Sequence, residues 1–189
     1  MANTLKDHRG IALVLCLLGA AASATPTAQA PMAPAADAPA EGPADAQALS
    51  RSYLALRKAP GHFNGGRWNA EVDGWGGRKQ RVMEQLAAEV LGRPTTAAGL
   101  RRLMQQPDEV TACPSAGCST IVSGLREGGE SSATSMAPAG WGREAVGSAL
   151  KQTTGASLWI YDWRGRHDRL VFVVAGDQVQ AGGWLYAGE

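Results

Sequence analysis

Two of the three histidines, His62 and His167, together with Asp73, Asp162 and Asp168, could perform acid–base chemistry in this sequence. His62 lies upstream, and His167 is followed directly by Asp168. An imidazole hydrogen-bonded to a carboxylate can act as a general acid or base, so either histidine could pair with Asp73, Asp162 or Asp168. The alternative is turn chemistry, in which Asp168 binds local backbone amides and His167 is a solvated residue of a hairpin turn. We favour the turn.

No nucleophile or phosphate-binding motif accompanies these groups. The sequence contains no G-x-S-x-G, H-E-x-x-H or P-loop pattern. A hydrolase that acts on glycan or peptide through His167 or His62 therefore stays an alternative. The sequence leaves catalysis open, favours a protein that is not an enzyme, and implies no cofactor.

Cys113 and Cys118 form a close pair in C-PSAG-C, where Pro114 and Gly117 suit the tight turn of a short bridge. Outside the cytoplasm such a pair oxidises, so we expect a structural disulfide. A redox pair usually has C-x-x-C spacing. A zinc site would need histidines to converge on both thiolates, which no spacing supports, so no metal is expected.

Residues 61–77 combine glycines with two tryptophans and two acids. Glu71 and Asp73 lie between Trp68 and Trp75. A sugar ring stacks on an indole and carboxylates accept hydroxyl protons, which suits a cell-wall glycan. The alternative is a loop whose tryptophans complete the core and whose acids favour the positive end of a helix that starts near Gly77.

The chain has 189 residues and a formal net charge of +1, which argues against a nucleic-acid or anionic-membrane partner. Residues 1–24 predict a signal peptide: Lys6 and Arg9 precede an apolar run over 11–22, and cleavage is expected after Ala24. The run is too short for a membrane span, which needs ~20 residues. We expect a periplasmic or secreted mature chain with no integral membrane span.

The remaining chain divides into a tether and one domain. Residues 25–48 are rich in Ala and Pro and predict a disordered tether. Residues 49–189 are long enough for a single domain with a real core. Within it, a loop insertion is expected at about 111–140, with a short strand or turn around Ile121 and a mobile stretch over 127–140.

Helical periodicity is confined to the first half of this domain, apart from a weaker helix expected within 141–153. A short helix is expected over 48–58, and an apolar stripe over 78–91 predicts a second, longer helix. Thr95 or Thr96 can cap a third, which carries Leu100, Leu103 and Met104 on one face. The helices over 78–104 would form a helical hairpin.

The last thirty residues change to strand periodicity. Residues 158–163, 169–174 and 178–187 are joined by hairpin-length segments that contain glycine. They predict a three-stranded antiparallel meander, with a bulge at Gly182 and Gly183. The expected fold is therefore α+β, with an N-terminal helical hairpin packed on a C-terminal three-stranded meander.

The order of these motifs resembles the SmpA/OmlA group of small envelope proteins, the BamE-like fold. The matching residues are Thr96, Leu100, Leu103, Pro107-Asp108, Trp159-Ile160-Tyr161, Leu170-Val171-Phe172 and Val179. The resemblance implies two helices on a three-stranded sheet and a role in envelope assembly without catalytic residues. The W-R-G-x-H-D motif that begins at Trp163, with Trp75 upstream, also resembles an uncharacterised secreted bacterial family.

Alternation along 158–163 places three rings on one face. Leu158 and Ile160 should face the helices, so Trp159, Tyr161 and Trp163 must be covered by the 61–77 loop, by the insertion or by a partner. The leading hypothesis is a non-enzymatic exported interaction module that binds an envelope protein or a cell-wall component. An inhibitor or immunity protein against a cell-wall hydrolase is the alternative. The candidate binding residues are Trp68, Asp73, Trp75, Trp163, Arg164, Arg166, His167 and Asp168.

Overall fold

The computed structural model describes residues 43–127 and 138–186, which fold as an α+β unit. Its elements are α1 (Pro43–Lys58), a 3-10 turn (His62–Asn64), α2 (Ala70–Asp73), α3 (Arg78–Leu91), α4 (Ala97–Met104), β1 (Glu109–Ala112), α5 (Ala116–Gly124), α6 (Arg143–Gln152), β2 (Ser157–Arg164), β3 (Asp168–Ala175) and β4 (Gln178–Tyr186). The expected signal peptide, most of the expected tether and residues 128–137 of the expected mobile loop lie outside the described residues. In the part described, no helix is long and apolar enough to cross a membrane.

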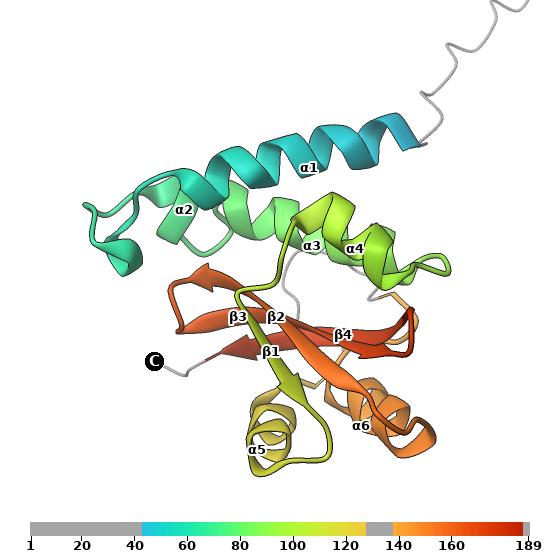
Figure 1. Ribbon diagram of the computed structural model, residues 1–189. Coiled ribbons are helices and arrows are strands. Elements are labelled where there is room, and N and C mark those ends of the chain that lie inside the picture. Colours follow the sequence, from blue (N-terminus) through green and yellow to red (C-terminus); the bar gives the residue numbers. More distant parts are fainter. Residues whose placement is uncertain (1–42, 128–137, 187–189) are drawn as a thin grey trace, which may run out of the picture. The chain divides into compact units, whose positions relative to one another are not determined.

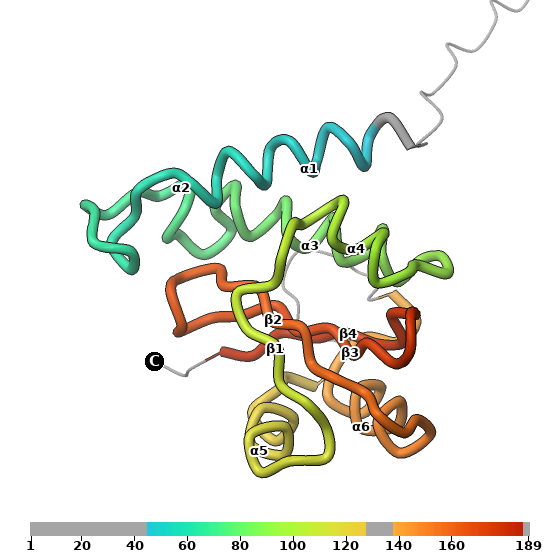
Figure 2. Tube along the Cα trace, viewed as in Figure 1, coloured from blue at the N-terminus to red at the C-terminus, as the bar shows by residue number. Residues whose placement is uncertain are grey.

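The sheet is an antiparallel meander with the strand order β1-β2-β3-β4 (Figures 1 and 2). The three expected strands are present. The sequence analysis was wrong to count only these, because β1 adds a fourth strand that pairs with β2 from Glu109↔Ile160 to Ala112↔Ser157. Its four residues alternate between half-buried and exposed positions. So short an edge strand carries almost no periodic signal.

The helical hairpin forms as predicted. The apolar stripe of α3 is buried, and the helix starts at Arg78 and ends at Leu91. The Thr96 hydroxyl accepts a hydrogen bond from the Gly99 amide at 3.0 Å, so Thr96 is the cap of α4. The helix expected over 48–58 is also present but begins earlier, at Pro43, so residues 43–48 belong to the domain and not to the tether.

The aromatic face of β2 packs against the helical hairpin, opposite to the expectation. Trp159, Tyr161 and Trp163 lie in one core with α1, α3 and α4, on the upper side of the sheet in Figure 1. Leu158 and Ile160 lie in a second core on the other side. Alternating residues of a strand lie on opposite faces of the sheet, but the alternation alone does not predict which face packs against which helix.

Two short helices cover that second face. Val146 of α6 and Ile121 of α5 pack against Leu158, Ile160 and their neighbours below the sheet (Figure 1). The expectation of a loop over 111–140 was therefore wrong for its first part. Helix α5 is short and contains two glycines, and its cap is Ser115, whose hydroxyl accepts from the Cys118 amide at 3.1 Å.

The bulge in β4 is displaced from the expected glycines. The register shifts between Val173↔Ala181 and Val174↔Val179, which leaves Gln180 as the extra residue. Gly182 stays in register opposite Phe172, and a Cβ at this position would lie 3.0 Å from the Phe172 ring. The glycine is needed for a close approach of the ring to the backbone.

The expected disulfide links Cys113 and Cys118, with a Cα–Cα distance of 5.6 Å. It ties the end of β1 to the first turn of α5. We predict that the double variant Cys113→Ala/Cys118→Ala loses about 2 kcal/mol of unfolding free energy, because the bridge restricts the unfolded chain. Urea unfolding measures this loss, and reduced wild-type protein should match the variant. Equal stability of the oxidised protein and the variant would contradict the prediction.

Candidate functional site

Four of the eight candidate binding residues meet around a buried arginine, Arg164, which is itself one of the four. The guanidinium carbon of Arg164 lies 4.6 Å from the Trp75 ring centroid, 4.7 Å from that of Trp163 and 5.2 Å from that of Phe63. The side chain of Arg164 is 4% exposed, and its Nε donates to the Asp168 carboxylate. We call these five residues the Arg164 cluster. It joins the β2–β3 hairpin to the loop over 61–77.

Hydrogen bonds and ring contacts hold the loop in this position. The Trp163 indole donates to the Val72 carbonyl at 2.9 Å, so β2 binds the backbone of α2. Trp75 packs edge-on against Trp163, with 5.0 Å between ring centroids, and lies 4.9 Å from the Tyr186 ring. Gly165 has a φ of +54°, and a Cβ there would lie 2.9 Å from the Phe63 carbonyl oxygen. Glycine therefore permits both the turn and the approach of the loop.

Asp73 is an internal anchor of the same loop. It is 1% exposed, and its Oδ2 accepts hydrogen bonds from the His62 and Asn69 amides, both at 2.8 Å. A carboxylate with two amide donors is well satisfied in the interior. Asp73 therefore organises the backbone of the loop instead of facing a ligand.

Four of the candidate residues are exposed. Trp68 is 57% and Trp75 52% exposed, and they lie on either side of α2. The Arg166 side chain is 79% exposed and approaches Glu109 at 3.7 Å, while His167 is exposed in the β2–β3 turn. The other candidates, Asp73, Trp163, Arg164 and Asp168, are buried, so a partner cannot reach them in this conformation. We call Trp68, Trp75, Arg166 and His167 the exposed rim.

Both histidines contact one ring. The His62 and His167 rings each lie 5.3 Å from the Phe63 ring, between centroids. The carboxylates considered as their partners bind other groups: Asp73 binds two amides, and Asp168 binds Arg164. The geometry therefore supports aromatic packing of the histidines more than an acid–base pair.

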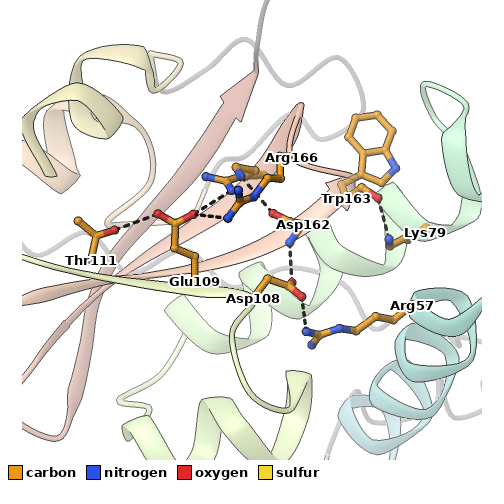
Figure 3. Close-up of polar contacts among 9 residues, drawn as sticks. Arg57, Lys79, Asp108, Glu109, Thr111, Asp162, Trp163 and Arg166 are labelled. Carbon is orange, nitrogen blue, oxygen red and sulfur yellow. Dashed lines mark hydrogen bonds and ion pairs between the residues drawn. The ribbon is translucent and has the colours of Figure 1, made fainter. Parts of the chain in front are cut away.

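A chain of charged contacts runs beside the cluster along β1 and β2 (Figure 3). Asp108 accepts from the Arg57 guanidinium at 2.6 Å and from the Asp162 amide at 2.8 Å, so it joins α1 to β2. Arg57 also donates to the Met104 and Gln106 carbonyls, both at 3.0 Å. The Pro-Asp motif thus fixes the crossing from the helices to the sheet.

The same chain continues across the sheet to Glu109. Arg169 donates to Asp162 at 3.1 Å and to Glu109 at 2.9 Å. Burial raises the pKa of the Asp162 carboxyl, nearby Asp108 adds to the rise, and Arg169 opposes it. The network links the strands through paired charges, and every member shown in Figure 3 has a partner within the fold.

A small cavity of about 200 Å³ lies between this network and the Arg164 cluster. Lys79 lines it, is 6% exposed, and donates to the Trp163 carbonyl at 2.7 Å. Burial lowers the pKa of the Lys79 ammonium, and Asp108 opposes this effect. Drug-sized ligands need cavities of roughly 300–1,000 Å³, so this one suits water better. The carbonyl contact gives Lys79 a structural role.

The sequence analysis missed Lys79 and the role of Arg57 as site residues. A signal for Lys79 existed, because it precedes Met83 by four residues and therefore shares the buried stripe of α3. Nothing local marks Arg57, whose partners come from residues about fifty positions away. Among the described residues, no group of His, Cys, Asp and Glu is arranged to hold a metal ion.

We predict that Arg164→Ala destabilises the protein by about 3 kcal/mol, because it leaves the Asp168 charge buried without its partner. Arg166→Ala, two positions along, should change stability by less than about 0.5 kcal/mol, because that side chain is exposed. Urea unfolding of both variants tests the contrast. Similar losses for the two would show that the cluster is not the structural centre described above.

We predict that Asp162→Asn is more stable than the wild type at pH 7. A carboxyl with a raised pKa binds its proton more tightly in the folded state, so its charged form costs stability above that pKa. The advantage of the variant should shrink as the pH falls toward the ordinary aspartate pKa of about 4. Asp177→Asn, in an exposed turn, is the control. A variant less stable than wild type at pH 7 would oppose this account.

Comparisons of the chain with protein-family models, with curated proteins and with solved structures gave no match. The resemblance to the SmpA/OmlA group therefore stays a prediction. Its motif residues have structural positions here: Thr96 caps α4, Asp108 ties α1 to β2, and Phe172 lies in the sheet core. Within the described residues, the geometry of the exposed rim is the best guide to function.

Proposed function

We propose that the chain is a non-enzymatic binding module of the bacterial cell envelope, exported by its N-terminal segment. The observation that carries this proposal is the exposure of Trp68 and Trp75, at 57% and 52%, on a loop that is otherwise anchored. Large exposed rings on a rigid support are typical of binding surfaces. The export part rests on the apolar run over 11–22 and on the small residues that precede Thr25.

The anchoring of the loop favours binding, because a loop that is already ordered loses little conformational entropy when a partner binds. Trp75 rests on Trp163 and Arg164, so its buried face is fixed and its outer face is free for a partner. Rigid aromatic residues lose little conformational entropy at an interface, and Trp and Arg are enriched among the residues that contribute most to affinity. His167, whose ring lies 5.3 Å from that of Phe63 in the same loop, adds an exposed polar group, and Arg166 precedes it in the β2–β3 turn.

Two partner classes fit the exposed rim: an envelope protein and a cell-wall glycan. For a glycan, Trp68 and Trp75 supply stacking surfaces, and Glu71 is the exposed carboxylate between them. Asp73 no longer belongs to such a site, because its carboxylate holds two backbone amides. The hydrolase alternative is less well supported, since Asp73 and Asp168 are committed to other groups.

We predict that Trp68→Ala and Trp75→Ala each weaken binding to an envelope partner by about tenfold, as expected for exposed aromatic anchors. Co-sedimentation with purified cell-wall sacculi measures glycan binding, and cross-linking in envelope membranes measures protein binding. Val110→Ala is the matched control, because Val110 is 56% exposed on β1 and lies outside the rim. Binding that is unchanged in both tryptophan variants, or absent in the wild type, would refute the proposal.

A further inference from the structure

A second concave surface lies on the other face of the sheet. A groove of about 610 Å³ separates α5 from α6, within the size range of small-molecule sites. Mainly apolar atoms line it. Its lining residues are Cys113, Pro114, Cys118, Ser119, Val122, Ser123, Arg143, Gly147, Leu150, Lys151, Thr153, Thr154 and Gly155.

Small side chains of both helices line the groove, among them Ser119, Ser123 and Gly147. A Cβ at Gly147 of α6 would meet no atom of the described part of the chain within 4 Å, so open space lies above this position. Val122 and Leu150 are only partly buried beside the second core. The disulfide closes the loop between β1 and α5, which holds one wall in place.

The hydroxyl groups of the lining are largely engaged with their own helices. Ser119 donates to the Ser115 carbonyl at 3.2 Å, Ser123 to the Thr120 carbonyl at 2.8 Å, and Thr153 to the Ala149 carbonyl at 2.8 Å. A ligand in the groove would therefore meet methyl and methylene groups more than free donors. The walls favour an apolar chain.

The charges of the lining have one sign. Among the described residues of its lining, Arg143 and Lys151 are charged and none is a carboxylate. Arg143 is partly neutralised by Glu127 at 3.1 Å, and its Nε donates to the Leu125 carbonyl at 2.7 Å. Lys151 is exposed in the last turn of α6, which places an ammonium beside the apolar groove. The groove is complementary to an anion attached to an apolar chain.

We propose that the α5–α6 groove binds a fatty acid, with the acyl chain along Val122, Gly147 and Leu150 and the carboxylate beside Lys151. The apolar walls stabilise the chain by removing it from water, and the cation selects the charged end. This site is separate from the exposed rim, because the rim belongs to the other side of the sheet. It does not depend on the proposed binding function.

Titration calorimetry of the purified chain with dodecanoate, below its micelle concentration, tests the proposal. Gly147→Leu fills the open space without opposing the helix, so it should weaken dodecanoate binding at least about tenfold. Lys151→Glu should weaken it about five- to tenfold and should leave dodecyltrimethylammonium, a cation with the same chain, unimpaired. Ala55→Leu and Lys58→Glu, both exposed on α1, are the matched controls and should bind as the wild type does.

Dodecanoate binding that falls in Gly147→Leu and Lys151→Glu, and not in the α1 controls, supports the site. Absence of binding to the wild type overturns the proposal. So does binding that survives Gly147→Leu in a variant whose thermal unfolding shows it to be folded. Wild-type affinity for dodecyltrimethylammonium equal to that for dodecanoate overturns the assignment of an anionic ligand.

Discussion

Arg164 carries its charge into the interior of the domain, and much of the surrounding structure is arranged to accommodate it. A buried cation is costly unless it is paired, and here Asp168 supplies the opposite charge while Phe63, Trp75 and Trp163 present their ring faces. Asp168 starts β3, so the pairing also fixes the hairpin. The rings come from the 61–77 loop and from β2. The loop that displays the exposed tryptophans is thus positioned by an interaction inside the fold.

The sheet is covered on both faces, and this explains the composition of its strands. Seven of the eight residues of β3 are buried, since α3 and α4 lie over one face and α5 and α6 over the other. Strands buried on both sides are apolar along their length instead of alternating. The larger rings belong to the face covered by α1 to α4, and smaller side chains belong to the face covered by α5 and α6. The α5–α6 groove lies on the second face.

The regular elements were predictable because their signals are local. Each signal lies within a short stretch of sequence: the apolar stripe of α3, the threonine cap of α4 and the glycine-containing hairpins. The close spacing of the two cysteines likewise predicted the disulfide. Helix α5 and strand β1 were not predictable, because they are short and gain their stability from the sheet. Which face of β2 packs against the helices depends on segments far away in the sequence. The partners of Arg57 also lie about fifty positions away. Trp163, Arg164 and Asp168 were predicted to bind a partner, but they are buried and contact one another inside the fold.

The central claim is that Trp163 and its neighbours are sealed beneath the 61–77 loop while Trp68 and Trp75 remain open to solvent. Hydrogen exchange of the indole N–H groups, followed by two-dimensional NMR, tests it most directly. The Trp163 indole, hydrogen-bonded to the Val72 carbonyl at 2.9 Å, should exchange as slowly as the central amides of β3, and those of Trp68 and Trp75 should exchange at once. Fast exchange at Trp163, comparable with that at Trp68, would contradict the account.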